Sequence, residues 1–293
     1  MTDQVLAQAV EEDALGGRGV WATVRRRVLF WLPLGVLVVL VLLAVFPQLF
    51  ASTDPRACDI SASAHPSSPG HPFGQDLQGC DVYANVVHGA RASLSVGLVC
   101  TLIALVIAVL VGTIAGYVGG WTDSVLARLT DVFLGFPFLL GAIVVLNGLG
   151  DRSVLSVSLV LAVFSWPALA RMVRTTVRAT RDAEYVQAAK AMGFPTRRIL
   201  SHYVLPNSIG PVLAVATLTV GGVIVAESTL TFLGLGLRAP SISWGLQLAT
   251  AQSRFQQAPH TLIYPGIFLA ATVLSLITLG DVLRDAVNPK GRS

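Results

Sequence analysis

Charged residues are scarce in this sequence of 293 amino acids. Asp, Glu, Lys and Arg make up 12% of it, while 54% of it is hydrophobic. The charged share is about half of what a soluble domain carries. So few charges cannot cover a water-facing surface of this size, and the composition therefore favours a protein embedded in a membrane.

Six stretches contain no Asp, Glu, Lys, Arg or His: 28–53, 92–122, 132–150, 153–170, 203–226 and 261–280. A helix that rises ~1.5 Å per residue needs about 20 apolar residues to cross ~30 Å of hydrocarbon. We therefore predict an all-α polytopic membrane protein. Its six transmembrane helices are expected near 28–50, 92–119, 124–148, 153–172, 207–229 and 262–284.

The rest of the chain divides around these helices. The apolar run at 28–50 is too long for a cleaved signal peptide, so we interpret it as a signal anchor. We expect the remaining segments to be a cytoplasmic N-terminal tail at 1–27, an extracytoplasmic loop at 51–91, a five-helix core at 92–285 with a cytoplasmic loop at 173–206, and a C-terminal tail at 286–293.

The distribution of Lys and Arg predicts the orientation. With the N-terminus inside and six spans, 15 of the 20 basic residues fall inside and five fall outside, at Arg56, Arg91, Arg152, Arg238 and Arg254. Inner loops of membrane proteins carry this excess. Both termini are therefore expected in the cytoplasm. The net charge of +4 follows from the topology and does not indicate nucleic-acid binding.

Motifs of catalysis and of nucleotide binding are missing. The only lysines are Lys190 and Lys290, and neither lies in the Gly-rich setting of a Walker A phosphate loop. The sequence also lacks HExxH, GxSxG and CxxC. We therefore expect no catalytic residue, no metal site and no cofactor bound by this chain.

Small residues recur at every fourth position of the second predicted span. They are Cys100, Ala104, Ala108, Gly112, Gly116 and Gly120. In lipid, a stripe of small residues lets two helix backbones approach closely. The partner helix could belong to the same chain or to a second subunit.

The longest inner loop is predicted to contain a short helix over 182–193. Asp182 can cap its N-terminus, and Glu184 in the first turn suits the helix dipole. Gly193 is a natural residue for the C′ position, with Pro195 beyond it. Thr196 can then cap a second short helix.

One side of the first short helix is predicted to be apolar and of low bulk, with Tyr185, Ala188, Ala189 and Met192 on it. Such a face can enter a groove of a partner protein or lie on the membrane surface.

The residues of this loop also carry a family resemblance. The pattern resembles the EAA motif of ABC importer permeases, whose loop docks into the ATP-binding subunit. The matching positions are Glu184, Tyr185, Ala188, Ala189, Gly193, Leu205 and Pro206, with Tyr185 and Val186 in place of the motif's first small residue.

Two further blocks narrow the resemblance to the C-type permeases of the dipeptide, oligopeptide and nickel importers. One block covers 71–76, 79–81 and 89–97 in the outer loop. The other covers 227–236 and is followed by Trp244 and Gly245.

The resemblance implies a type I ABC importer permease in the bacterial cytoplasmic membrane. Its implied partners are a second, non-identical permease, one or two ATPase subunits that hold ATP and Mg²⁺, and an extracytoplasmic substrate-binding protein. Peptides are the implied cargo, with nickel, glutathione or haem-type ligands as alternatives. An ion-coupled secondary transporter is a rival class, but it needs intramembrane ionisable groups and often an internal repeat.

Glu227 is the one carboxylate deep in an apolar stretch. Together with Phe232 and Trp244, it is a candidate for the pore or its outer gate. The alternative is a structural role, in which the carboxylate caps a turn at Ser228 and Thr229. A charge at mid-membrane is costly, so Glu227 is expected to face protein or water.

Two of the three cysteines, Cys58 and Cys80, lie in the predicted outer loop, and Cys100 lies in a span. Cys80 replaces an arginine that the similar permeases carry. Two cysteines on the oxidising side of a membrane favour a Cys58–Cys80 disulfide. Free thiols and a metal site that includes His65 and His71 are the alternatives.

Overall fold

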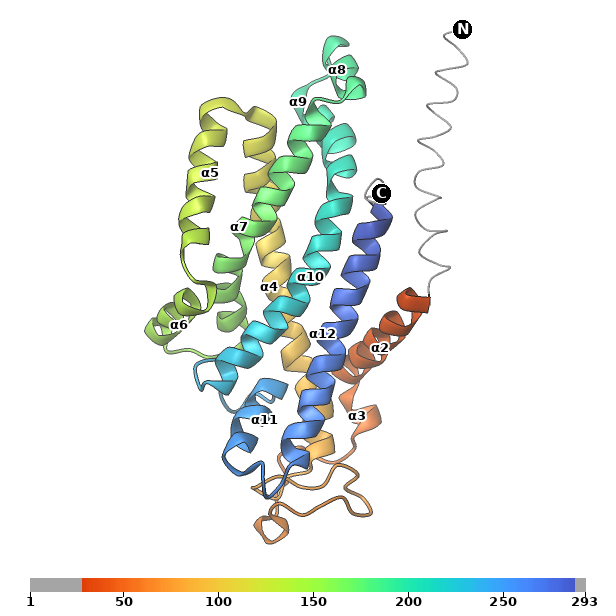
Figure 1. Cartoon of the computed structure of the whole chain (residues 1–293), viewed down its shortest axis with the longest axis vertical. Helices are drawn as coiled ribbons and strands as arrows, with labels where there is room; N and C mark the ends of the chain where they lie inside the picture. The colour runs from red at the N-terminus through yellow and green to blue at the C-terminus, as the bar shows by residue number, and fades with distance from the viewer. Residues whose placement is uncertain (1–27, 288–293) are drawn as a thin grey trace.

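The computed structural model describes residues 28–287 as a bundle of long helices (Figure 1). The predicted N-terminal tail at 1–27 lies outside the described residues. Of the predicted C-terminal tail at 286–293, residues 286–287 belong to α12 and residues 288–293 lie outside the described residues. The helices are α2 (Val28–Val45), α3 (Pro47–Phe50), η1 (Ile60–Ala62), α4 (Val82–Val118), α5 (Gly120–Gly135), α6 (Phe138–Leu149), α7 (Val154–Arg181), α8 (Glu184–Ala191), α9 (Thr196–Ile199), the π-helix η2 (Leu200–Val204), α10 (Leu205–Phe232), α11 (Trp244–Ala251), η3 (Gln252–Arg254) and α12 (His260–Val287).

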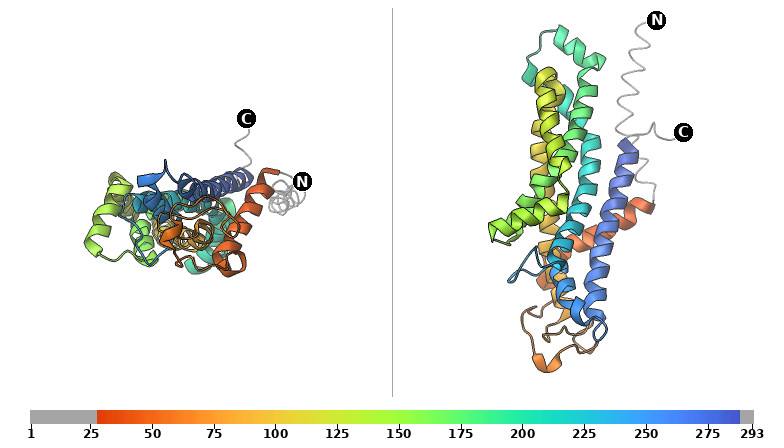
Figure 2. Two further views of the ribbon diagram at one scale, coloured as in Figure 1. Left: turned by 90° about the horizontal axis from the view of Figure 1, so that it is seen from below. Right: turned by 60° about the vertical axis from the view of Figure 1, so that its left-hand side comes forward.

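Within residues 28–287, four helices are long and apolar enough to span a membrane: α4, α7, α12 and the continuous stretch Thr196–Phe232 that contains α10. The third predicted span differs from expectation. It is a pair, α5 and α6, that bends by 83°. Phe136 is extended before Pro137, as the residue preceding a proline tends to be, and this interrupts the helix. Figure 2 shows α6 turned away from the bundle axis.

The helix α4 begins about ten residues before the expected start at 92. Asp81 caps its first turn, where its carboxylate accepts hydrogen bonds from the N–H groups of Tyr83 (2.8 Å) and Ala84 (3.3 Å). The first predicted span is also divided, because Pro47 begins the separate short helix α3. The apolar part of α2 is therefore shorter than a full membrane crossing.

The centre of the bundle is the packing of α4 against α7. On α4, Cys100, Ala104 and Ala108 are fully buried, and Gly112 and Gly116 continue the same buried stripe. A Cβ atom on Gly112 would lie 2.6 Å from the Cβ of Val173. The small-residue stripe therefore packs within this chain, and Gly120, which begins α5, lies outside the contact.

The opposite side of α4 exposes large apolar side chains to the surroundings. They recur every fourth residue, at Leu98, Leu102, Val106, Leu110, Ile114 and Val118, and each is about half exposed. A helix with a small-residue seam on one side and leucines and valines on the other suits a lipid environment.

The two ends of the bundle differ in character. The helices α8 and α9 lie at one end, which we call the α8 end, whereas α11 and the loop 51–81 lie at the other, the α11 end (Figure 1). Seen from the α11 end, the loop lies across the ends of the helices (Figure 2).

Candidate functional site: the loop that carries α8

The short helix α8 starts without the predicted cap. Its N-cap residue is Ala183, which makes no side-chain cap, and Asp182 instead pairs with Arg181 (Nε to Oδ1, 2.8 Å). The prediction of an Asp182 cap was therefore wrong, because the neighbouring guanidinium competes for the carboxylate. The same pairing holds the pKa of Asp182 below its usual range. Glu184 lies in the first turn, as expected.

The end of α8 is formed by Gly193, at a φ of +77°. The Gly193 N–H donates to the carbonyl of Lys190 (2.9 Å), and the Phe194 N–H donates to that of Ala189 (3.2 Å). These two bonds are the Schellman pattern, in which the C′ residue adopts the left-handed conformation that glycine tolerates best. The predicted C′ position of Gly193 is confirmed.

The two sides of α8 are divided differently from the prediction. Val186 and Ala189 are buried against the rest of the chain, so Ala189 lies on the inner side of the helix. Tyr185 and Met192 are exposed, at 45% and 66%, and Ala188 is exposed between them. The spacing of these three residues places them on one outward apolar face of low bulk.

The second short helix is part of a continuous rod. Thr196 is the first residue of α9, after Pro195 at the N-cap position, so Thr196 does not cap a separate element. The π-helix η2 then leads directly into α10, with Leu205 and Pro206 in the first turn of α10. Pro206 has no N–H to donate within this continuous rod, and just before it the Leu205 N–H donates to the carbonyl of Leu200 in a wider π turn.

At the α11 end, Glu227 is completely buried. Its carboxylate accepts hydrogen bonds from the hydroxyls of Thr231 (2.8 Å), Ser228 (3.3 Å) and Ser243 (3.4 Å). Since Ser243 is the N-cap residue of α11, the buried carboxylate joins α10 to α11. From the sequence, a turn is expected at Ser228 and Thr229. The structure instead continues α10 without a break to Phe232.

Trp244 is also completely buried beside this cluster. Its indole Nε1–H donates to the carbonyl of Val86 (2.9 Å), and its backbone N–H donates to the hydroxyl of Ser93 (3.1 Å). Phe232 ends α10 and is partly exposed. The structure therefore brings Glu227 and Trp244 together around the start of α11, inside the protein.

The loop before α4 carries a disulfide that links Cys58 to Cys80. Beside it, Gly79 has a φ of +77° and lies so close to the backbone of Asp59 that no side chain would fit. The two candidate histidines point elsewhere. The Nδ1 atom of His71 lies 2.9 Å from Oδ2 of Asp81, and that of His65 lies 3.1 Å from the carbonyl of Pro66.

Comparison with known proteins decides the family. Residues 108–293 match the model of the binding-protein-dependent transport system inner membrane component. The chain belongs to this family of permeases. The permease is 37% identical to the oligopeptide transport system permease protein OppC of Escherichia coli, over 99% of this chain and 97% of the relative.

Two other relatives are similarly close to the permease. The dipeptide transport system permease protein DppC of Alkalihalophilus pseudofirmus is 36% identical, over 86% of this chain and 83% of the relative. The glutathione transport system permease protein GsiD of Salmonella typhimurium is 36% identical, over 93% of this chain and 90% of the relative.

Solved structures share the fold of the permease. The inward-facing methionine ABC transporter MetNI superposes with a TM-score of 0.58 at 19% identity, over 69% of this chain and 96% of the other. An amino acid ABC transporter with histidines gives a TM-score of 0.54 at 15% identity, over 68% of this chain and 92% of the other. At these identities the likeness concerns the fold alone.

The permease also contains a set of ion pairs that the sequence did not reveal. On α7, Arg174 pairs with Asp123 of α5 (Nη2 to Oδ2, 2.7 Å), and Arg171 pairs with Asp131 (2.8 Å). Arg181 reaches the carbonyl of Tyr117 at the end of α4 (3.3 Å). These contacts fasten α5 and α4 to the helix that carries α8. For the first pair, the sequence signal was Asp123 between two predicted spans, on the side predicted to carry Arg174. Asp131 and Arg171 lie inside predicted spans, so their pairing left no such signal.

Proposed function

We propose that the permease is the transmembrane subunit of an ATP-driven importer and forms half of its translocation pathway. Support comes from the family match, from relatives named as peptide permeases, and from the folds of ABC importers. Peptides are the proposed cargo, because the names of two of the relatives specify dipeptides and oligopeptides.

The α8 end is proposed to face the cytoplasm, with the N-terminus on the same side. The support is the excess of basic residues in the segments at this end, which include Arg181, Lys190, Arg197 and Arg198. The α11 end, with its disulfide, then faces the oxidising side of the membrane.

The observation that carries the proposal is the outward face of α8. Tyr185, Ala188 and Met192 are exposed apolar residues on a helix with a well-defined end, held between α7 and the rod that continues into α10. A short helix with such a face suits a groove on a partner protein. The proposed partner is a separate ATPase subunit, which holds ATP and Mg²⁺, so that the permease itself is not catalytic and binds no cofactor.

The remaining proposed partners are a second, non-identical permease, an extracytoplasmic substrate-binding protein and the surrounding lipids. One or two ATPase chains complete the assembly. ATP closes the ATPase dimer, the two docked helices move together, and the paired bundles rock between inward-facing and outward-facing arrangements. Rigid-body motion of packed helices is a common form of such transitions.

Reconstitution of the complete importer tests this function. The wild type is expected to take up a labelled tripeptide into liposomes only with ATP and the binding protein. Ala188→Trp is expected to abolish uptake while the subunit still inserts, because an added indole cannot enter a close-packed groove. Ala188→Ser, which adds one oxygen, serves as the control. Equal uptake by all three proteins would refute docking through this face.

Glutathione is a second candidate cargo, favoured by the GsiD relative. Glutathione is itself a tripeptide, so both candidates require recognition of amide groups and of charged ends. Calorimetric titration of the partner binding protein with trialanine and with glutathione separates the two. The ligand with the lower dissociation constant identifies the cargo class.

A further inference from the structure

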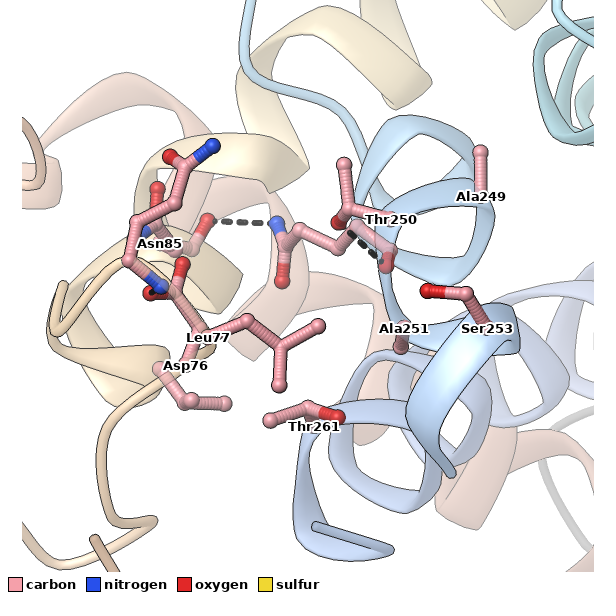
Figure 3. A pocket seen from close by; sticks show the side chains of 11 residues that line it. Asp76, Leu77, Asn85, Ala249, Thr250, Ala251, Ser253 and Thr261 are labelled. Carbon is pink, nitrogen blue, oxygen red and sulfur yellow. Dashed lines mark hydrogen bonds between the residues drawn. The ribbon is translucent and has the colours of Figure 1, made fainter. Parts of the chain in front are cut away.

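A polar cleft lies at the α11 end, between the loop before α4 and α11. One lobe, of about 330 Å³, lies between the turn 76–78 and Asn85 on one side and α11 and the start of α12 on the other (Figure 3). A second lobe of about 440 Å³ shares Asp76, Asn85, Gln247 and Thr250 with the first. Volumes of this order suit small ligands. We call the two lobes the outer cleft.

The walls of the outer cleft are held rigidly. Oδ1 of Asp76 accepts hydrogen bonds from the N–H groups of Gln78 and Cys80, each at 2.8 Å, and Cys80 is bonded to Cys58. Across the cleft, Nε2 of Gln247 donates to the carbonyl of Asn85 (2.9 Å). Side chains held in this way keep their positions before a ligand arrives, which lowers the entropy lost on binding.

The hydrogen bonds within the walls of the outer cleft use N–H groups as donors and leave oxygen atoms of Gln247 and Asp76 without a partner in the described chain. A carbonyl can only accept, so the amide nitrogen of Gln247 must face Asn85, and Oε1 of Gln247 points away. That oxygen is buried and has no hydrogen-bond partner within residues 28–287. Oδ2 of Asp76 likewise makes no hydrogen bond to the part of the chain that the structure describes.

Two of the three hydroxyls that line the first lobe follow the same rule. Thr250 donates its hydroxyl hydrogen to the carbonyls of Gln247 (2.9 Å) and Leu246 (3.3 Å), and Thr261 donates to Ala258 (2.7 Å). Their oxygens keep lone pairs that can accept. The lobe therefore offers one carboxylate and hydroxyl acceptors, which match a ligand that is cationic and rich in N–H groups.

Charge distinguishes the two lobes. The described lining residues of the first lobe include no Lys, Arg or His, and Asp76 is their one charged group. The second lobe is bordered by Arg56, whose Nη2 donates to the carbonyl of Pro240 (2.8 Å). A cation is thus favoured in the first lobe and disfavoured beside Arg56 in the second.

The geometry points to the first lobe of the outer cleft as a receiving site for the amino terminus of the peptide cargo. This inference rests on the proposed function. The α-ammonium group is a cation with three N–H donors, and it would bind Oδ2 of Asp76, with the hydroxyl oxygen of Thr250 as a second acceptor. The other lining groups are amides, hydroxyls and the apolar side chains of Leu77, Val82, Ala249 and Ala251. Because none of them is charged, the site would recognise the end of a peptide without selecting its side chains by charge.

A direct binding measurement tests the site without relying on transport. The full chain in lipid nanodiscs is titrated with trialanine and with N-acetyl-trialanine, and binding is followed by saturation-transfer NMR. Asp76→Asn keeps the Oδ1 acceptor of the turn and removes the charge. It is expected to weaken trialanine binding about tenfold, or about 1.4 kcal/mol, and to leave the acetylated peptide unaffected. Identical trialanine affinities in the variant and the wild type would overturn the proposal.

Asp59→Asn is the matched control. Asp59 lies in the same loop and accepts a hydrogen bond from the N–H of Ser61 in a similar turn, but it does not line the cleft. The variant removes the same charge, so unchanged trialanine binding is expected. Equal weakening by both variants would assign the effect to the net charge of the loop and would also overturn the proposal.

Uptake by the complete importer then identifies the source of the ammonium group. With the cargo as the source, Asp76→Asn lowers uptake of trialanine relative to that of the acetylated peptide. An equal drop for both peptides would assign the cleft to a basic side chain of the binding protein and would overturn the cargo assignment. A wild-type importer without any ATP-dependent uptake contradicts the proposed function, whereas the nanodisc titration still decides the site.

Discussion

Gly112 offers a sharp test of how closely α4 and α7 pack. A Cβ atom added there would lie 2.6 Å from the Cβ of Val173 and 2.7 Å from the carbonyl oxygen of Ala170. Neither atom is the far end of a flexible side chain. The helices must therefore separate by about 1 Å to accommodate Gly112→Ala, and a gap of ~0.5–1 Å forfeits roughly a quarter to a half of each dispersion contact.

The destabilisation caused by Gly112→Ala is estimated by comparison with a glycine whose surroundings can accept a Cβ atom. Gly222 lies in α10 and is exposed, and a Cβ atom there would meet nothing within 4 Å. Both alanine variants gain the same helix propensity of about 1 kcal/mol, so this contribution cancels in the comparison. What remains is the overpacking at Gly112, about 1–3 kcal/mol.

The assay is thermal unfolding of the full chain in detergent, followed by intrinsic fluorescence. Gly222→Ala is expected to melt at or slightly above the wild-type temperature. Gly112→Ala is expected to melt lower than Gly222→Ala, by about 2–4 °C for each kcal/mol in a chain of this size class. If Gly112→Ala melted as high as Gly222→Ala, α4 and α7 would not be in the close contact described, and the argument would fail.

Three further changes test other parts of the molecule. Gly193→Val is expected to uncouple ATP hydrolysis from uptake, because valine does not tolerate a φ of +77°. Gly193→Asn is expected to retain uptake, because asparagine tolerates this conformation. Parallel ATPase and uptake assays check both expectations. Replacing Cys58 and Cys80 by serine is expected to cost roughly 3 kcal/mol of stability through the freed loop, and thiol titration of the wild type that finds both cysteines free would contradict the bridge. Glu227→Ala is expected to destabilise the protein by about 1–3 kcal/mol more than Glu227→Gln, because it strands three hydroxyl donors, and the difference in melting temperature measures this.

The sequence predicted the long helices because long apolar runs admit few other structures in lipid. It missed the first ten residues of α4, where Asn85, His88 and Arg91 look like loop residues. The structure shows that tertiary partners satisfy Asn85 and Arg91, whereas the ring of His88 lies against the carbonyl of Ala84 in its own helix. Arg91, for example, donates from Nε to the carbonyl of Ala44 (2.9 Å) and from Nη2 to that of Val45 (3.0 Å). Such partners lie about 46 residues away and leave no local pattern.

The coupling loop shows the same limit at shorter range. Gly193 could be placed from sequence because a helix end that requires positive φ favours glycine in any context. The role of Asp182 could not be predicted in the same way. Arg181 is its neighbour in sequence, and only the folded geometry decides whether the carboxylate pairs with Arg181 or caps α8. The orientation of Ala189 depends in turn on which side of α8 rests on the bundle.

The uninterrupted rod from Thr196 to Phe232 has a mechanical consequence. Its 37 residues, at ~1.5 Å each, make a lever about 55 Å long without an intervening loop. The Schellman turn attaches α8 to one end of this lever, and the buried carboxylate of Glu227 anchors the other end to α11. A tilt of a few degrees imposed at α8 therefore becomes a sideways displacement of several ångströms at the far end. The wider turns of η2, close to the α8 end of the rod, are the place where torque from α8 would be taken up first.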